Sequence, residues 1–491
     1  MEDFQLKKEM GLAAVKNRAV KGVVFLSGRM FFVQAISFLG FFFLTVFLGQ
    51  EEIGLFFAVS ELVAILGYFS DVGLAAALIQ TREKPTIKEI RSTFTVQQVL
   101  VVSLLAIVLA LTPWLKTFYN IQQAGIFLLG ALLFGFFLSS LKTIPSVLLE
   151  RKLRFDLLVV VEIVEALLFY GIAVWLAWRG NGVASYAWAI IIRSLVGAVL
   201  IYIFSPWRIG FALEKESLRR LLRFGVPFQA NTFLAVIKDR LMNVFLWRII
   251  GASGVGILGW AQKWAQMPLR FVMDAVMKVT FPAYARMQDH KQELGKAIEK
   301  TLFFVSLVVF PMLMGIGLLA KPLIALIPQY GKWEVALIAL YFFLVNSALG
   351  ALTTPLTNAL NAIGRIKVVF KLMIMWTVLT WGIYPYLALK YGFNGVAAGA
   401  AIVSLSSVLA IIIAKRYLQF KFWSAVLKPT MASIIMGFVL FVFLSFLKIN
   451  LWVMILLSAG SGFLYFIVLY LMVGQALLLD VKKLFYAFRN R

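Results

Sequence analysis

The sequence predicts an all-α polytopic membrane protein, and three observations carry that prediction. First, 62% of the 491 residues are hydrophobic and 14% are charged, whereas a soluble protein has about 25% charged residues. Second, apolar runs long enough to cross a bilayer as helices recur along the whole chain. Third, the basic residues gather in every second connection between those runs.

The apolar runs predict about fourteen membrane-spanning helices. Their expected limits are 22–48, 54–79, 94–112, 124–146, 157–177, 182–203, 225–248, 255–281, 302–320, 334–361, 368–388, 394–414, 429–447 and 450–473. About 32 of the 47 Lys and Arg residues lie in the terminal segments and in the connections after even-numbered spans. Because cytoplasmic loops carry this excess, both termini are expected in the cytoplasm. The scattered basic loops explain the net charge of +25 as topology, so nucleic acid is not expected as a partner.

Three pairs of short segments recur in the same order, roughly 200 residues apart. The pairs are 48–54 with 250–256, 149–155 with 363–370, and 181–188 with 394–401. They predict two six-helix lobes in a parallel pseudo-twofold repeat around a central cavity, plus two C-terminal helices. The expected domains are an N-lobe (1–204), a cytoplasmic linker helix (205–222), a C-lobe (223–420), and the last two spans with a cytoplasmic tail (421–491).

The composition excludes several kinds of chemistry. The chain has no Cys and a single histidine, His290, so neither a thiolate nor a histidine-cluster metal site is expected. No phosphate-binding loop of the G-x-x-x-x-G-K-[ST] type occurs, which argues against ATP hydrolysis. A membrane glycosyltransferase or polymerase would need acidic catalytic residues beside a large outside loop, and no such loop is expected. We therefore expect no enzyme activity, catalytic residue, metal or cofactor.

The predicted span 255–281 carries a charged stripe, which consists of Lys263, Arg270, Asp274 and Lys278. At 100° per residue these positions lie within about 80° of one another and extend roughly 22 Å along the helix. A stripe of that length cannot face lipid, because a central charge there costs several kcal/mol. It must face a wet cavity or a partner. Asp274 can neutralise its neighbours instead, although three cations against one anion leave excess positive charge. Pro268 could supply a hinge in this helix.

Other charges also lie inside the predicted spans. The span at 225–248 contains Lys238, Asp239 and Arg240, which cannot all share one face. Arg29 can line the cavity or extend its side chain to the cytoplasmic surface.

Two pairings of these charges are predicted. Glu165 and Arg193 lie at equal depth, which predicts a structural ion pair. The repeat places Glu61 opposite Lys263, so these two can form a gate, or each can be satisfied within its own lobe.

A cationic cavity in the membrane suits an anionic substrate, and phosphate in particular. At this point the residues resemble a known family. The segments 48–80, 145–155, 257–288 and 360–365 resemble the Wzx-type polysaccharide flippases of the multidrug/oligosaccharidyl-lipid/polysaccharide exporter superfamily. The motifs include "PSVLLERKLRF" and "LNAIGR", and the resemblance runs over nearly the whole chain.

The resemblance implies alternating access that moves an undecaprenyl-diphosphate-linked oligosaccharide from the inner to the outer leaflet of a bacterial or archaeal cytoplasmic membrane. Membrane lipids are the other implied partner, and polysaccharide polymerase machinery is a further candidate. By position in the matching helices, the substrate-binding candidates are Arg29, Arg240, Lys263, Arg270 and Lys278. The candidate coupling or gating residues are Glu61, Asp239 and Asp274. Two alternatives remain, a lipid-linked peptidoglycan precursor flippase and a cation-coupled multidrug antiporter of the same superfamily.

The predicted orientation can be tested with single cysteines, because the native chain has none. A cysteine in the 205–222 link should escape an impermeant thiol reagent in intact cells and react after lysis. A cysteine in the first outside loop, 49–54, serves as the positive control. Labelling of the link in intact cells would show that the orientation is reversed.

Overall fold

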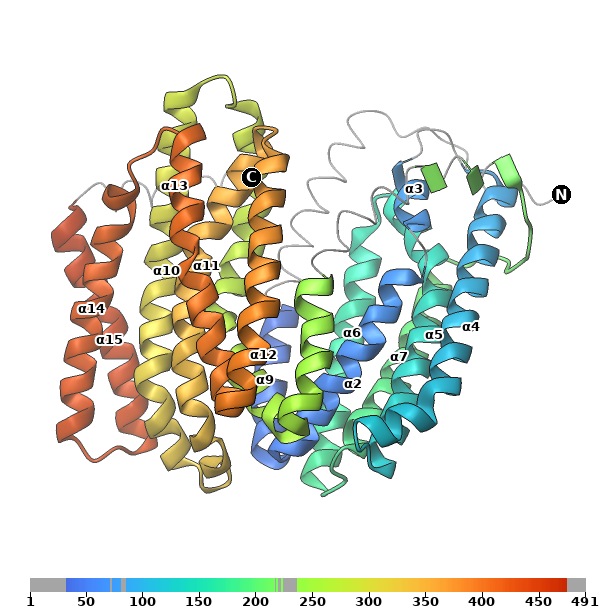
Figure 1. Cartoon of the computed structure of the whole chain (residues 1–491), viewed down its shortest axis with the longest axis horizontal. Helices are drawn as coiled ribbons and strands as arrows, with labels where there is room; N and C mark the ends of the chain where they lie inside the picture. Colours follow the sequence, from blue (N-terminus) through green and yellow to red (C-terminus); the bar gives the residue numbers. More distant parts are fainter. Residues whose placement is uncertain are drawn as a thin grey trace. The chain divides into compact units, whose positions relative to one another are not determined.

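The computed structural model describes residues 32–70, 73–80, 85–216, 218–219, 222–223 and 236–474, without the side chains of Asp274 and Ala275. These residues form helices and connecting segments, and none of them lies in a β-strand. The all-α prediction is therefore confirmed. The chain forms two compact units that divide between Val255 and Gly256 (Figure 1). We call them unit 1 and unit 2.

The first described helix of unit 1 is the apolar segment Phe32–Phe47. Its further helices are α2 (Gln50–Phe69), α3 (Leu74–Gln80), α4 (Ile87–Phe118), α5 (Gln123–Arg151), α6 (Phe155–Trp178), α7 (Ala184–Phe204) and the π-helical turn η1 (Ile237–Leu241). The next helix, α9 (Met242–Arg286), leads from unit 1 into unit 2. Within unit 1 the described part of α7 packs against both α5 and α6.

Unit 2 contains the rest of α9 and the elements that follow it. These are α10 (Lys291–Leu326), η2 (Pro328–Ala336), α11 (Leu337–Ala362), α12 (Ile366–Leu405), α13 (Ser407–Tyr417), α14 (Phe422–Phe446) and α15 (Leu451–Val473). The core of this unit forms where α10 packs against α11 and α14. Helix α15 packs mainly on α14, and its surface toward the surroundings is apolar.

The described residues contain eleven helical segments that are long and apolar enough to cross a membrane. Two of these segments each hold two predicted spans, because a glycine with positive φ interrupts the helix at Gly251 (φ 70°) and at Gly392 (φ 57°). Together with the helix Phe32–Phe47, each of the fourteen predicted spans has a helical counterpart. The protein is a multi-pass membrane protein.

One predicted span differs from the structure, and two neighbouring helices add detail. The span predicted at 54–79 is two helices, because α2 ends where the Ser70 hydroxyl bonds the Gly67 carbonyl. Helix α9 continues through Pro268 and is interrupted at Gly251, and a hinge at Pro268 stays a prediction. Helix α10 begins at Lys291, directly after His290, and runs without interruption into the predicted ninth span.

The first part of the predicted linker helix, residues 206–214, is extended rather than helical. Two side-chain hydroxyls near the start of α4 accept hydrogen bonds from the backbone of this segment. The Ala212 N–H donates to Thr95 Oγ1 (3.1 Å), and the Glu214 N–H donates to Ser92 Oγ (3.0 Å). Amides that bond to side chains are unavailable for a helical ladder, which corrects the prediction for this part of the linker.

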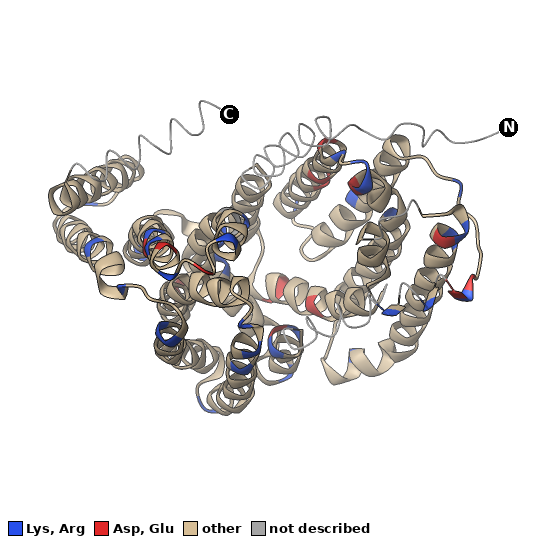
Figure 2. Ribbon diagram, turned by 90° about the horizontal axis from the view of Figure 1, so that it is seen from above, with Lys and Arg blue, Asp and Glu red and all other residues tan. Residues whose placement is uncertain are grey.

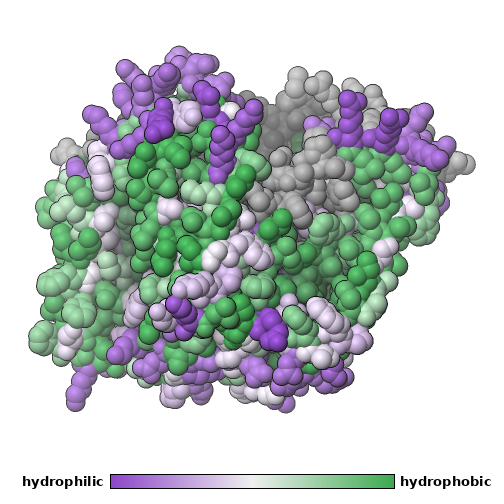
Figure 3. Space-filling view, viewed as in Figure 1, coloured by the Kyte–Doolittle hydropathy of each residue, from purple (hydrophilic) through white to green (hydrophobic). Residues whose placement is uncertain are grey.

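Hydrophobic side chains cover the middle of the helices, and hydrophilic ones gather at their two ends (Figure 3). This band is the surface expected where a helical protein meets the hydrocarbon of a bilayer. Basic residues outnumber acidic ones by 47 to 22, and both kinds occur in each unit (Figure 2). Charges that lie within the band therefore need partners, water or substrate.

A charged cluster joins three helices inside unit 1. The Glu165 carboxylate on α6 accepts a hydrogen bond from Lys142 Nζ on α5. It also lies directly against α7 at Gly197, where an added Cβ would stand 1.5 Å from Glu165 Oε1. Glycine is therefore required at residue 197 for the carboxylate to reach this position.

Arg193 belongs to the same cluster but is held differently from the prediction. Its Cζ atom lies 4.6 Å from the centroid of the Phe169 ring, a cation–π arrangement. It also interacts electrostatically with Glu165 and Tyr170. Among the described residues the direct ionic partner of Glu165 is thus Lys142, and Arg193 contributes at longer range.

Removal of one partner from this cluster should destabilise unit 1. Lys142→Met leaves the largely buried Glu165 carboxylate without its direct partner. The free energy of unfolding should therefore fall by about 2 kcal/mol. The unfolding midpoint of the purified protein in detergent should fall. The double variant Lys142→Met, Glu165→Gln should recover most of the loss, and Lys152→Met at the exposed end of α5 is the control. A single variant as stable as the native protein would show that the pair is not structural.

Candidate functional site

One face of α9 in unit 2 is basic. After Gly251 the helix is continuous, so Lys263, Arg270 and Lys278 fall within about 80° of one another as the sequence predicts. They extend roughly 22 Å along the helix, most of the thickness of a hydrocarbon core of about 30 Å. We call these three residues the basic face.

The opposite side of the same helix holds it in the core of unit 2. Leu269, Val272, Met273 and Val276 contact α10 and α11 through a cluster that includes Val305, Val309, Leu313 and Ala351. These packing positions point roughly 130° away from the basic face at 100° per residue. Packing of the apolar side therefore turns the basic face away from the core of the unit.

The three cations differ in exposure. Lys263 is half-buried, whereas Arg270 and Lys278 are exposed on the surface of the unit. Arg270 donates from Nη2 to Gln266 Oε1 (3.0 Å), one helical turn earlier. The predicted neutralising residue, Asp274, has its side chain outside the described part of the chain. Charges so deep in a membrane protein are stabilised by an opposite charge, by water or by an anionic ligand.

In unit 1 the triplet Lys238, Asp239 and Arg240 forms the π-helical turn η1. A π-turn bonds each N–H to a carbonyl five residues back, and such turns occur frequently at functional sites. Lys238 Nζ lies 3.1 Å from Asp239 Oδ1, so these two neighbours pair locally. The Asp239 side chain remains 64% exposed.

Arg240 pairs with Glu61 of α2. Its Nη1 donates to Glu61 Oε2 at 2.8 Å, and the two side chains are 42% and 30% exposed. Glu61 lies about 16 Å along α2 from Gln50, close to half the thickness of the hydrocarbon core. The ion pair thus joins η1 to α2 deep within the membrane-spanning part of unit 1.

The start of α9 also contacts α2 and the end of α4. Ser253 Oγ donates to Gln50 Oε1 (3.2 Å), and these residues are 203 positions apart. Trp247 stacks on Tyr119, with ring centroids 4.3 Å apart. A contact between residues one repeat apart is what a symmetry axis would produce, although the pseudo-twofold repeat itself stays a prediction.

The other predicted site residues remain candidates. Arg29 lies outside the described residues. The predicted gate joins Glu61 of unit 1 to Lys263 of unit 2, and that pairing stays a prediction. In unit 1 the structure brings together Glu61 and Arg240, which the sequence analysis did not pair. Their equal depth in the membrane could have indicated this pair from the sequence. Glu61 follows the start of α2 by about as many residues as Arg240 precedes Gly251.

The described residues offer no group of three or more His, Cys, Asp or Glu side chains placed to hold a metal ion. The cations of the two sites are guanidinium and ammonium groups. Such groups bind carboxylate and phosphate, Arg through two parallel hydrogen bonds and Lys as a point charge.

Comparison with known proteins places this geometry in a family. A family model described as "Polysaccharide biosynthesis protein" matches residues 43–336. The teichuronic acid biosynthesis protein TuaB of Bacillus subtilis (strain 168) is 21% identical over 384 residues, which cover 76% of this chain and 77% of TuaB. The lipopolysaccharide biosynthesis protein WzxC of Escherichia coli (strain K12) is 27% identical over 241 residues, covering 49% of this chain and 46% of WzxC.

A third relative is the succinoglycan biosynthesis transport protein ExoT of Rhizobium meliloti (strain 1021), 23% identical over 69% of this chain and 68% of ExoT. Among solved structures, the lipid II flippase MurJ in an inward closed conformation aligns with a TM-score of 0.75 and 16% identity, covering 93% of this chain and 100% of that one. An inward-facing MATE family transporter aligns with a TM-score of 0.59 and 20% identity, covering 80% and 97%.

The two structural likenesses show the fold, which is that of helical membrane transporters. The family match covers more than half of the chain and lies over the helices that carry both charged sites. This chain belongs to the polysaccharide biosynthesis protein family, and the comparisons confirm its resemblance to the Wzx-type flippases of the multidrug/oligosaccharidyl-lipid/polysaccharide exporter superfamily.

Proposed function

We propose that this protein flips an undecaprenyl-diphosphate-linked oligosaccharide from the cytoplasmic to the outer leaflet by alternating access. The observation that carries the proposal is the basic face of α9, with Lys263, Arg270 and Lys278 on one side of a helix that is packed on the other. A diphosphate is the anion that such a face suits, because it offers several acceptor oxygens to guanidinium and ammonium groups. The hydrocarbon tail of the substrate can stay in the bilayer meanwhile.

The relatives support a saccharide as the cargo. Their names refer to biosynthesis of teichuronic acid, lipopolysaccharide and succinoglycan, and that of ExoT includes transport. For this chain we therefore propose a location in a bacterial or archaeal cytoplasmic membrane, with both termini in the cytoplasm. Polysaccharide polymerase machinery would receive the product on the outer side. The protein would act without a catalytic residue, because flipping makes and breaks no covalent bond.

Arg240 offers a way to couple substrate to conformation. In the structure its guanidinium is bound to the Glu61 carboxylate. A diphosphate that reaches Arg240 would replace this carboxylate and release η1 from α2, so that binding would favour a different arrangement of these elements. Arg240 and Arg29 thus remain candidate substrate contacts. Glu61, Asp239 and Asp274 remain candidate coupling or gating residues.

Two alternatives differ from the proposal in substrate. A cation-coupled drug antiporter is disfavoured, because a basic face repels cationic drugs, and likeness to a MATE transporter at 20% identity concerns the fold. A lipid-linked peptidoglycan precursor carries a diphosphate as well, so it would satisfy the same basic face. The saccharide distinguishes the two flippase substrates, and a transport assay that supplies each of them in turn decides between them.

The basic face should be required for transport but not for folding. In proteoliposomes, Arg270→Ala with Lys278→Ala should lower the rate at which an undecaprenyl-diphosphate oligosaccharide crosses the membrane by at least about tenfold, because the diphosphate loses charge-assisted contacts. Arg270→Lys should recover part of the rate, since ammonium keeps the charge but not the two-point geometry.

Lys296→Ala, at an exposed position of α10, is the matched control and should transport normally. The folding of each variant is checked by its elution in size-exclusion chromatography and by its unfolding midpoint. Native transport rates in the folded double variant would refute the role of the basic face in substrate binding.

A further inference from the structure

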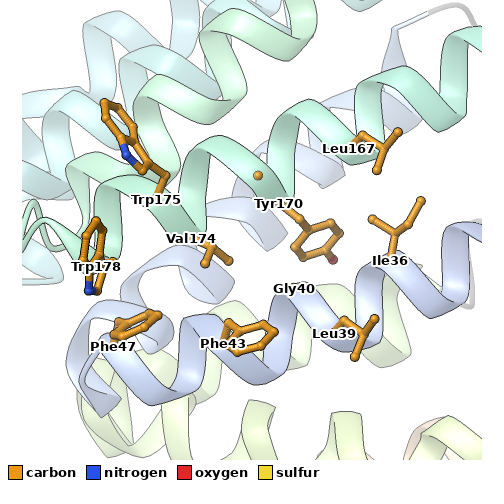
Figure 4. Close-up of a pocket in the computed structure, with 11 residues that line it drawn as sticks. Ile36, Leu39, Gly40, Phe43, Phe47, Leu167, Tyr170, Val174, Trp175 and Trp178 are labelled. Atoms are coloured by element: carbon orange, nitrogen blue, oxygen red, sulfur yellow. The ribbon is translucent and has the colours of Figure 1, made fainter.

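An open apolar groove runs along unit 1 between the helix Phe32–Phe47 and α6 (Figure 4). Its volume of about 620 Å³ lies within the range of about 300–1,000 Å³ that ligand pockets span. Each helix contributes one row of side chains at helical spacing. At one end stand Phe47, Trp175 and Trp178, and at the other Ile36 and Leu167 (Figure 4).

The groove is not filled by the described protein. Leu39, Leu167 and Trp178 are 55%, 53% and 63% exposed. The two helices meet where the Tyr170 side chain packs on Gly40, whereas a Cβ added to Gly171, which also lines the groove, would meet no atom within 4 Å. An apolar groove of this kind on a membrane-spanning unit takes hydrocarbon, because neither water nor a polar group gains a hydrogen-bond partner there.

The dimensions of the groove suit a single chain from one leaflet. From Ile36 to Phe47 it measures about 16 Å at 1.5 Å per residue, roughly half of the hydrocarbon core of about 30 Å. Its two walls are single neighbouring helices that run in the same direction (Figure 4). A single polyprenyl chain can lie along such a groove, parallel to the two helices.

A cation stands at the aromatic end of the groove. The Cζ atom of Arg179 lies 5.4 Å from the Trp175 ring centroid and 5.8 Å from that of Trp178. Within the described part of the chain, no carboxylate forms a salt bridge with Arg179. The two indoles thus hold a guanidinium where the groove ends, in a position complementary to a phosphate that heads a chain lying in the groove.

We infer that this groove binds the polyprenyl chain of the lipid-linked substrate, with the diphosphate at Arg179. The inference rests on the proposed function and adds a second binding place, separate from the basic face of α9. In the predicted orientation the ends of both helices at Phe47 and Trp178 face the outer surface. The groove therefore receives the lipid in the outer leaflet, after it has crossed.

The groove can be closed without disturbing the fold. Gly171→Phe places a ring in open space, and Gly130→Phe on α5 is the matched control, because a Cβ there also meets no atom within 4 Å. Undecaprenyl diphosphate is titrated into the full-length protein and the bound copies are counted by native mass spectrometry. The native chain should bind two copies, Gly171→Phe one, and Gly130→Phe two.

The charged end is tested with a pair of probes. Arg179→Gln should weaken the affinity of the groove for undecaprenyl diphosphate by about tenfold and leave that for uncharged undecaprenol unchanged, since only the diphosphate uses the guanidinium. Phosphatidylglycerol, an anionic lipid with two chains, should not displace the second copy. Displacement by phosphatidylglycerol at equal concentration would overturn the inference and make the groove a site for bilayer lipid.

The outcomes also separate this inference from the proposed function. If Gly171→Phe still binds two copies while the Arg270→Ala, Lys278→Ala variant loses one, the groove inference fails and the basic face stands. If the native chain binds no undecaprenyl diphosphate, the proposed function fails, and this inference fails with it.

Discussion

The free energy of a charge in hydrocarbon governs the arrangement of this protein. A charged side chain at the centre of a bilayer costs several kcal/mol unless it meets an opposite charge, water or a ligand. In unit 1 the intramembrane charges meet partners within the unit. Lys142 contacts Glu165, and Arg240 contacts Glu61. These pairs link helices that the apolar surfaces alone would not orient uniquely, because every helix is hydrophobic on most of its circumference.

In unit 2 the intramembrane cations lie on one side of a single helix. The basic face of α9 carries Lys263, Arg270 and Lys278 away from the packed core. A basic surface in a membrane is favourable when an anion is bound, and the proposed role of this face is therefore in binding substrate. A phosphate-bearing lipid supplies both the anion and a tail that remains in hydrocarbon. Cation-rich surfaces of this kind explain why a transporter for such a lipid contains charges that a purely structural helix would avoid.

Local features were predictable from the sequence, and tertiary pairings were not. The prediction that Lys263, Arg270 and Lys278 share one face of a helix was correct, because it follows from helical periodicity. Periodicity does not tell which helix stands beside another. The prediction paired Glu165 with Arg193, whereas the direct ionic partner in the structure is Lys142 of α5 and Arg193 contributes at longer range. The partner of Glu61 depends on the packing of α2 against η1, and the π-turn itself has no clear sequence signal. The linker helix was wrong in its first part because hydroxyls of α4 compete for its amides.

The central claim is that cations in the membrane-spanning helices serve a phosphate and not only one another. The most direct measurement is transport by the neutral double variant Glu61→Gln, Arg240→Gln, in which neither partner keeps an unpaired charge. This account predicts a folded protein with a native-like unfolding midpoint, because the amides can still bond across α2 and η1. It also predicts transport reduced by at least about tenfold, because the diphosphate loses its guanidinium contact. A folded double variant that transports undecaprenyl-diphosphate oligosaccharide at the native rate would contradict the claim and leave the pair a structural one.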